Sequence, residues 1–231
     1  MHVNKMSNKK NVLVVVAHTD DESFGCGGFI KKLNLQKFKI YAVSFTNGVS
    51  ARKDVGKKEI ANRIKSANKA AKILGFNWIE NFNYQDNELD KISTLSLVKK
   101  IEIIKKKIKP SIVITHNYTD LNVDHRKIFE ATLTAFRPEP NSTVKKIITF
   151  EVPSSTDFRM LKKNDNFIPN LFIDIDKYIK CKINAIKSYK GEVKKKPHSR
   201  SIEGVKNLSK IRGNQCGVNY AEAYEVIREI V

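Results

Sequence analysis

The stretch NVLVVVAHTDDESFGCGG at residues 11–28 joins an apolar run to a cluster of ionisable side chains and then to glycines. Residues 12–17 are all apolar, which is typical of a strand covered on both faces of a parallel sheet. His18, Asp20, Asp21 and Glu22 follow directly. Three carboxylates beside one imidazole repel one another unless a positive charge lies among them. The stretch therefore predicts a first strand that ends at a cation site.

Strand and helix signals alternate through most of the chain, which favours a mainly parallel sheet covered by helices. We expect strands at 11–17, 39–46, 78–83, 111–116, 145–152 and 170–175, and helices at 24–35, 57–74, 95–108, 123–136, 176–189 and from Ala221. In the longest helix, helical spacing predicts an inward face of Ile60, Ile64, Ala67, Ala71 and Leu74. The segments at 153–169 and about 190–219 are expected to be irregular. Without a repeat or a clear linker, the pattern predicts one domain over 1–231.

Polar clusters follow three of these strands. His18 and its acids follow the first strand, TNGVSAR follows the second at 46–52, and His116, Asp120, Asn122, Asp124 and His125 follow the strand at 111–116. The carboxyl ends of parallel strands share one edge of the sheet, where ligands bind in such folds. The three clusters are therefore expected to meet.

Histidine nitrogens and carboxylate oxygens are ligands that zinc accepts, and a catalytic zinc site keeps three protein ligands and a water. His18 and Asp21 lie three residues apart on a tight turn, and His125 can approach them from the start of a helix. Asp20 is better suited to be the general base toward an activated water. Asp124 is placed to orient an imidazole from behind.

The first cluster also has simpler interpretations. DDES alone could be an acidic helix N-terminus, and Glu22 could be such an acid or a support for the ligands. The second cluster makes capping alone a poor explanation. The glycines Gly25, Gly27 and Gly28 match neither a Walker motif nor G-x-G-x-x-G, and indicate close packing of helix on strand.

The chain carries 43 Lys and Arg against 24 Asp and Glu, a formal net charge of +19. Such a charge suits nucleic acid, an anionic membrane or a phosphorylated substrate. The lysines are spread along the sequence without an RNA-binding motif, which favours solvated surface positions. Three cysteines without paired spacing, no secretory signal and no apolar run long enough to span a bilayer favour a cytoplasmic protein without stable membrane insertion.

In its acid–histidine clusters the sequence resembles the LmbE-like, or PIG-L, family of metal-dependent N-deacetylases. The resemblance covers most of the chain and rests on five motifs: AHTDDE (17–22), TNGVSAR (46–52), THNYTDLNVDHR (115–126), FEVPSSTDF (150–158) and PHSRS (197–201). It implies a Rossmann-like three-layer α/β/α fold with a mainly parallel sheet.

The resemblance also implies roles for individual residues. His18, Asp21 and His125 correspond to the ligands of one zinc ion, although other divalent metals are possible. Asp20 corresponds to the general base, and Arg52 to a substrate-contacting arginine. The implied reaction is removal of an N-acetyl or other N-acyl group from an N-acetylglucosamine-type amino sugar or its conjugate.

Two positions depart from the family pattern. Thr19 replaces the usual proline, which loosens the turn but keeps the ligands. Asn122 stands where many members have a histidine that stabilises the oxyanion or donates a proton. An amide can donate a hydrogen bond but cannot deliver a proton. The acid could then be Asp20 after it has taken a proton, or His116 or His198.

Two other functions remain open at this stage. A metal-dependent phosphoesterase would use two metals bridged by carboxylates. A non-catalytic basic protein that binds nucleic acid would leave the acid–histidine clusters without a purpose, so nucleic acid is not the expected partner. The expected partner is a small amino-sugar conjugate, and a homo-oligomer is possible.

Overall fold

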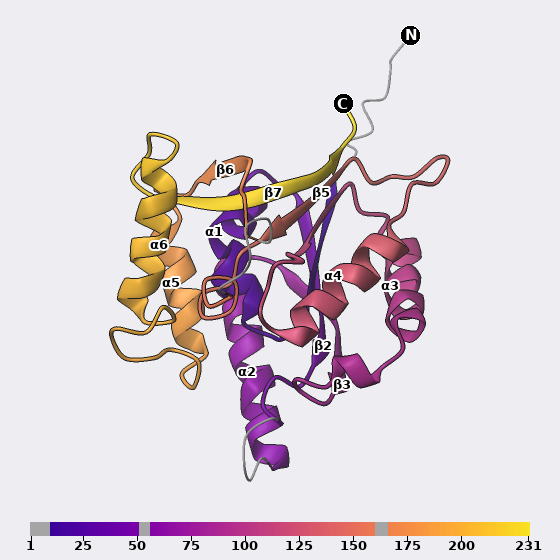
Figure 1. Cartoon of the computed structure of the whole chain (residues 1–231), viewed down its shortest axis with the longest axis horizontal. Helices are drawn as coiled ribbons and strands as arrows, with labels where there is room; N and C mark the ends of the chain where they lie inside the picture. Colours follow the sequence, from indigo (N-terminus) through magenta and orange to yellow (C-terminus); the bar gives the residue numbers. More distant parts are fainter. Residues whose placement is uncertain (1–9, 51–55, 160–165) are drawn as a thin grey trace.

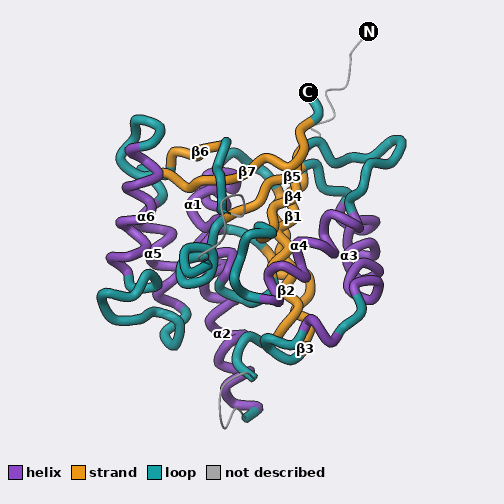
Figure 2. The backbone as a smooth tube through the Cα atoms, in the orientation of Figure 1, coloured by secondary structure: helices purple, strands orange, loops and turns teal. Residues whose placement is uncertain are grey.

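The computed structural model describes residues 10–50, 56–159 and 166–231 of the chain. They form a three-layer α/β/α fold around one seven-stranded sheet (Figures 1 and 2). The strands are β1 (Asn11–Val16), β2 (Lys39–Thr46), β3 (Asn77–Tyr84), β4 (Ile112–His116), β5 (Lys146–Phe150), β6 (Leu171–Asp174) and β7 (Ala221–Glu229). The helices are α1 (Asp21–Leu35), α2 (Lys57–Leu74), α3 (Thr94–Ile108), α4 (Val123–Ala135), α5 (Ile179–Ser188) and α6 (Ile202–Asn214), with a short 3₁₀ helix η1 (Leu89–Lys91).

The strand order is β3-β2-β1-β4-β5-β7-β6. β1 pairs in parallel with both β2 and β4, and β3 and β5 extend the parallel part on either side. β7 is antiparallel to β5 and to β6. The order reverses between β1 and β4, and this reversal opens a crevice at the carboxyl ends of the strands. The expected Rossmann-like, mainly parallel sheet is confirmed.

Both faces of β1 are buried, which explains its unbroken apolar sequence. Val12, Val14 and Val16 face the layer that contains α1, α2 and α5, whereas Leu13 and Val15 face the layer of α3 and α4. All five side chains are fully buried. Because successive strand residues point to opposite faces, only a strand buried on both sides needs every position to be apolar.

The glycines of α1 allow the helix to approach the sheet closely. A Cβ atom on Gly25 would lie 2.1 Å from the ring of Phe150, and one on Gly28 would lie 2.6 Å from Ile175. Both distances are far below van der Waals contact, so these positions tolerate no side chain without displacement. The packing interpretation of the glycines is confirmed for Gly25 and Gly28.

The carboxy-terminal part of the chain corrects two sequence predictions. The last segment, from Ala221, is a strand and not a helix, and the segment at about 190–219 contains α6. Ala and Glu favour helices in isolation, but pairing of β7 with two neighbours supplies backbone hydrogen bonds that override this preference. Ser201 caps α6 by accepting a hydrogen bond from the backbone of Gly204.

The inward face of α2 also differs from the prediction. Arg63 is buried, together with Ala67, Ala70 and Leu74, whereas Ile64 is 43% exposed. The buried stripe therefore begins with a charged residue, and an arginine is buried only when its charge is compensated.

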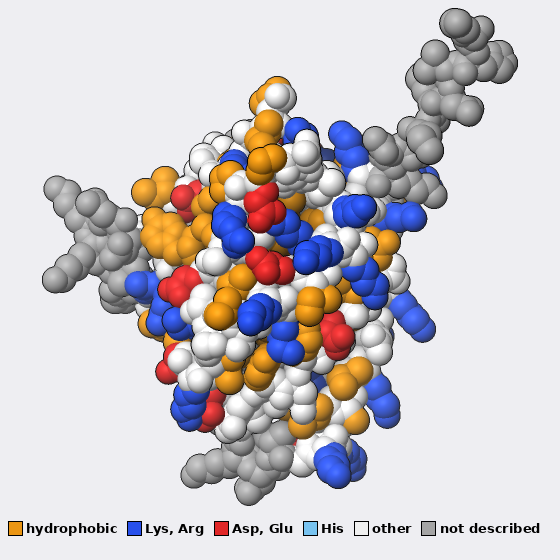
Figure 3. All heavy atoms as spheres, turned by 90° about the vertical axis from the view of Figure 1, so that its right-hand side faces the viewer, with side chains coloured by type: hydrophobic (Ala, Val, Ile, Leu, Met, Phe, Trp, Pro, Cys, Tyr) orange, Lys and Arg blue, Asp and Glu red, His pale blue; other side chains and the backbone are white. Residues whose placement is uncertain are grey.

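The basic side chains are dispersed over the surface of the molecule that Figure 3 shows. Lysines and arginines alternate there with uncharged and acidic side chains, and they do not collect in one groove. This distribution agrees with the expectation that most of the +19 charge occupies solvated positions. Within the described ranges, no helix combines the length and the apolar character needed to cross a membrane.

Candidate metal-dependent active site

The polar clusters meet at the carboxyl edge of the sheet, beside the point where the strand order reverses. His18 follows β1, Asp86 follows β3, and His125 lies in the first turn of α4, which follows β4. Asn122 begins α4 as its N-cap and accepts a hydrogen bond from the backbone N–H of Asp124, 2.8 Å away. The cap fixes the first turn of α4, and with it the direction of the His125 side chain.

Three atoms of the predicted metal ligands converge on one point. His18 Nδ1 lies 3.1 Å from His125 Nε2 and 3.2 Å from Asp21 Oδ2. His125 Nε2 lies 3.3 Å from the same Asp21 oxygen. The tight turn after β1 holds Asp21, because its Oδ2 also accepts the backbone N–H of His18 at 2.9 Å.

This arrangement fits a small divalent cation. Zinc binds histidine and carboxylate ligands at about 2.0–2.2 Å, so two ligands of a tetrahedral ion lie about 3.3 Å apart. The three observed separations, 3.1, 3.2 and 3.3 Å, match one triangular face of that tetrahedron. The ligand types are also those that zinc prefers. His18, Asp21 and His125 would hold one such ion beside the cavity.

Carboxylates hold His18 from the side away from the ligand triangle. Its Nε2 lies 2.9 Å from Asp86 Oδ1 and 3.2 Å from Asp124 Oδ2. Asp124 is fixed in turn by the backbone N–H groups of Asn87 and Leu89, at 2.8 and 2.9 Å. A carboxylate on the remote nitrogen fixes the tautomer that presents Nδ1 to a metal.

His125 has an equivalent support. Its Nδ1 lies 3.0 Å from Asp120 Oδ2, so Nε2 is the nitrogen left for a metal. Asp120 also accepts hydrogen bonds from the hydroxyls of Ser155 and Thr156 and from the backbone N–H of Asn122. Each of the two candidate histidine ligands thus has a carboxylate against its remote ring nitrogen.

The local charges shift the pKa values of these groups strongly. Although burial disfavours its charge, the pKa of the Asp21 carboxyl is held well below its usual range by His125, His18 and His116. Burial would lower the pKa of His125, but Asp120 and Asp21 raise it to about 9. Burial also disfavours the charged form of His18. The acids Asp21, Asp124 and Asp86 outweigh this effect and raise the pKa of His18 well above its usual value. The site is built to hold positive charge, which is what a metal ion supplies.

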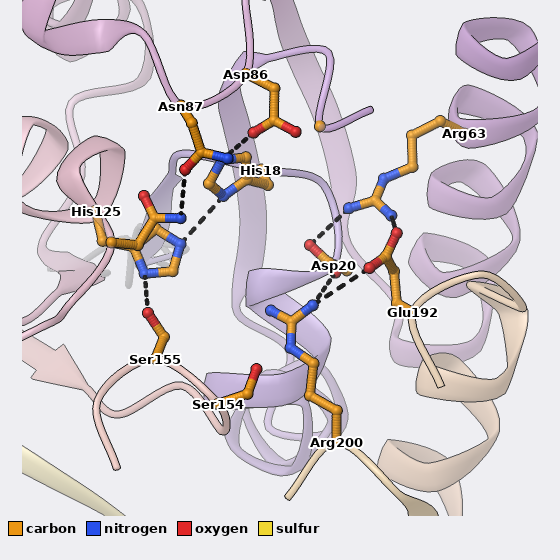
Figure 4. Close-up of a pocket in the computed structure, with 12 residues that line it drawn as sticks. His18, Asp20, Arg63, Asp86, Asn87, His125, Ser154, Ser155, Glu192 and Arg200 are labelled. Atoms are coloured by element: carbon orange, nitrogen blue, oxygen red, sulfur yellow. Dashed lines mark hydrogen bonds and ion pairs between the residues drawn. The ribbon is translucent and has the colours of Figure 1, made fainter. Parts of the chain in front are cut away.

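Asp20 is held between two arginines beside this triangle (Figure 4). Arg63 Nη2 lies 2.7 Å from Asp20 Oδ1, and Arg200 Nη1 lies 3.1 Å from Asp20 Oδ2. Glu192 pairs with both arginines, at 2.6 Å from Arg63 and 3.4 Å from Arg200. Burial raises the pKa of the Asp20 carboxyl, and the two guanidiniums limit that rise. The result is a buried carboxylate with a fixed direction.

A cavity of about 310 Å³ lies over these groups. Figure 4 shows the lining side chains arriving from opposite sides, with His18, His125 and Asn87 on one side and Arg63, Arg200 and Glu192 on the other. Among the described residues, the lining is formed by His18, Asp20, Gly48, Arg63, Asp86, Asn87, Asn122, His125, Ser154, Ser155, Glu192 and Arg200. A predominantly polar cavity of this size suits one small hydrophilic ring more than an apolar ligand.

Comparison with known proteins agrees with this site. The model of the family described as PIG-L, GlcNAc-PI de-N-acetylase, matches residues 13–136, more than half of the chain. The chain belongs to the PIG-L family. The matched range contains both histidines and the aspartate of the ligand triangle.

Similar proteins extend the likeness over nearly the whole chain. The uncharacterized deacetylase YaiS of Escherichia coli is 29% identical over 194 residues, covering 80% of this chain and 92% of that protein. Diacetylchitobiose deacetylase from Thermococcus kodakarensis is 25% identical over 229 residues, covering 94% and 83%. The structure of N,N'-diacetylchitobiose deacetylase from Pyrococcus horikoshii superposes with a TM-score of 0.76 at 22% identity, covering 96% of this chain and 85% of that chain. This last likeness shows the shared fold.

Not all residues predicted for the site of this PIG-L member reach the cavity. His116 is fully buried, stacks on His125 at 3.9 Å, and its Nε2 accepts the backbone N–H of Ala17. Burial and the neighbouring His125 lower the pKa of His116 to about 4. Its burial and its stacking place it behind His125, outside the described lining of the cavity.

His198 also lies outside the cavity lining. Its Nδ1 accepts the backbone N–H of Arg200 at 3.0 Å, and its ring packs edge-on against Phe158. The structure therefore gives it a place in holding the segment that carries Arg200. Arg52 lies outside the described residues. Asn122 does line the cavity, with its Nδ2 donating to Asn87 Oδ1 at 3.0 Å.

Sequence reasoning gave no role to Arg63, Asp86, Asp120 and Glu192. A charged residue on the buried stripe of α2 was an available signal for Arg63. The polar run after the third strand was a signal for Asp86, since it falls on the same sheet edge as the other clusters. Glu192 had no such signal, because only the tertiary fold brings the turn after α5 beside α2.

Proposed function

We propose that this chain is a zinc-dependent hydrolase that removes the N-acetyl group from an N-acetylglucosamine-type amino sugar or its conjugate. The single observation that carries the proposal is the ligand triangle of His18, Asp21 and His125, with Asp20 fixed beside it in the same cavity. Family membership supports the reaction type, and the diacetylchitobiose deacetylases that resemble the chain support the sugar.

His18, Asp21 and His125 would hold the ion. When bound, the metal would act as a Lewis acid toward the acyl carbonyl and lower the pKa of a water to about 7. Asp20 then accepts the proton from that water. Its two arginine partners hold the carboxylate in one direction, so the proton acceptor does not need to be oriented during the reaction.

The remaining steps use groups that line the cavity. Asn122 replaces the histidine common in the family and can donate a hydrogen bond from Nδ2 to the oxyanion after exchanging its present partner, Asn87. Because an amide cannot deliver a proton, the protonated Asp20 carboxyl is the donor to the leaving amine. Arg52 remains a proposed substrate contact.

The geometry favours one ion over the two that a phosphoesterase would use. The further acids near the triangle, Asp86, Asp120 and Asp124, face the remote nitrogens of the two ligand histidines. Carboxylates in that position orient the imidazole ligands of a single ion.

The test is acetate release by zinc-loaded protein from a panel of N-acetylglucosamine substrates: the free sugar, a β-linked disaccharide, a nucleotide conjugate and a lipid-linked form. Release that stops with a chelator and returns with Zn²⁺ is the expected result. A protein that holds one zinc ion per chain and releases acetate from none of them would contradict the proposal. Two ions per chain with phosphate release from a phosphoester would favour the phosphoesterase.

A further inference from the structure

Behind Asp20, four residues form a closed circuit of contacts, and one of them, Tyr189, does not line the cavity described above. Tyr189 donates its hydroxyl hydrogen to Glu22 Oε1 at 2.8 Å, and Glu22 Oε2 accepts the backbone N–H of Asp20 at 2.9 Å. Arg63 lies over the Tyr189 ring, 5.1 Å from its centre, and pairs with Asp20 Oδ1 at 2.7 Å. These contacts therefore hold Asp20 both by its backbone N–H and by its carboxylate.

We propose that Tyr189 is a positioning residue for the Asp20 carboxylate, acting through Glu22 on one side and Arg63 on the other. The proposal rests on the function proposed above only in taking Asp20 as the proton acceptor. Tyr189 touches neither the ligand triangle nor the cavity above it.

The backbone of Asp20 explains why it needs such support. Its φ is 147° and its ψ is −27°, a conformation that L-residues rarely adopt. A backbone in such a region is strained and persists only where its surroundings over-determine it. The Asp20 carbonyl also begins α1 by accepting the N–H groups of Ser23 and Phe24, at 2.9 and 3.0 Å. The strained residue is thus fixed at its carbonyl by α1 and at its N–H by Glu22.

Glu22 is fully buried, so its direction depends on the donors around it. Its Oε1 accepts from Ser23 at 2.7 Å and from Tyr189 at 2.8 Å. Ser23 is its neighbour in sequence and moves with the same helix turn. Tyr189 is the C-cap residue of α5, so its hydroxyl ties Glu22 to a different element of the fold.

Removing the tyrosine hydroxyl should therefore loosen the base without disturbing the metal ligands. Misplacement of a reacting group by about 1 Å can cost a factor of about 100 in rate. For Tyr189→Phe we expect kcat to fall by about 10- to 100-fold, with KM and the metal dissociation constant within about twofold of the unmodified protein. Phenylalanine keeps the ring under Arg63, so the variant tests the hydroxyl alone.

Tyr224→Phe is a matched control. Tyr224 is also fully buried and donates to a buried carboxylate, Glu222 Oε2, at 2.7 Å. It supports the later part of α1, where Glu222 accepts the N–H groups of Gly28 and Phe29. We expect both variants to lose thermal stability similarly, and only Tyr189→Phe to lose kcat.

A double variant tests the path of the effect. If Tyr189 acts through Glu22, adding Tyr189→Phe to Glu22→Gln should cost much less than it costs alone, because residues of one hydrogen-bond network are not additive. Unchanged kcat in folded Tyr189→Phe would overturn the proposal. Equal loss of kcat in the Tyr224→Phe control, or loss of kcat in proportion to bound metal, would also overturn it.

A second readout separates this proposal from the proposed function. Crystal structures of the unmodified protein and Tyr189→Phe should show the Asp20 carboxylate displaced from Arg63 only in the variant, while His18, Asp21 and His125 superpose. An undisplaced Asp20 would refute the positioning role whatever the substrate proves to be. An inactive unmodified protein with a displaced Asp20 in the variant would instead refute the deacetylase and retain the positioning role.

Discussion

Replacing Asp120 by asparagine should weaken metal binding without removing a ligand. Asp120 Oδ2 faces His125 Nδ1 at 3.0 Å, and in the metal-bound protein that nitrogen carries the proton and donates to the carboxylate. Asparagine has nearly the same shape, so the oxygen that accepts from the Asn122 backbone and from Ser155 can be retained. Its amide nitrogen would then face the His125 N–H, donor against donor, and the charge that supports the imidazole is lost.

Loss of such a supporting partner costs about 10- to 100-fold in metal affinity, which corresponds to about 1.4–2.8 kcal/mol. We expect the zinc dissociation constant of Asp120→Asn, measured by competition with a chromogenic chelator at pH 7.5, to rise by that factor. The circular dichroism spectrum should remain that of the unmodified protein.

Asp176→Asn is the control for the same chemical change away from the site. Asp176 is an acid that accepts hydrogen bonds from Asn219 and from the Tyr220 backbone near the start of α5. Its replacement should leave zinc affinity unchanged. If Asp120→Asn also bound zinc as tightly as the unmodified protein, His125 would not be the oriented ligand inferred from the geometry.

Three further outcomes follow from the site and its packing. Asp20→Asn should keep one zinc ion per chain, measured by elemental analysis, and its kcat should fall by more than about 100-fold because the variant lacks the proton acceptor. A kcat near that of the unmodified protein would reject Asp20 as the general base. In metal-free protein, the pKa of His125 near 9 exceeds its unfolded value of about 6.5, so its stabilising effect is complete below about pH 6.5 and is lost as the pH rises through 9. Urea unfolding of the metal-free protein should therefore give a lower midpoint at pH 9 than at pH 6.5, and a midpoint that rises over this range would argue against the buried charge. Gly25→Ala should lower the free energy of unfolding by about 1–3 kcal/mol, because its Cβ would meet the ring of Phe150 at 2.1 Å. Gly27→Ala is the control, since the nearest neighbour of a Cβ at Gly27 is 3.4 Å away. Equal losses of stability for the two variants in chemical denaturation would contradict this packing.

The sequence was informative about the central part of the fold because its signals are local. Continuous apolar runs mark strands buried on both faces, and the alternation with helices implies parallel pairing. The last strand shows the limit of such signals. Its sequence, AEAYEVIRE, favours a helix locally, and only its position between β5 and β6 makes it a strand.

The same distinction applies to the site. His18, Asp20 and Asp21 were recognisable because one short turn contains them, and His125 because parallel strands bring the ends of β1 and β4 to one edge. The sequence therefore determined which residue types gather at that edge. It could not show that His116 lies behind His125, or that Asn122 donates to Asn87, since these facts depend on side-chain direction.

Only the tertiary structure decided what surrounds the base. Arg63 comes from α2, Glu192 from the turn after α5 and Arg200 from the segment before α6, and their distances in sequence from Asp20 carry no information about contact. They meet because a buried carboxylate must be compensated by buried cations, and these cations must in turn be balanced. The sequence by itself thus determined the parallel part of the sheet and which candidate ligands gather at its edge, whereas the packing of α2 and α5 against α1 determined how the carboxylate of Asp20 is held.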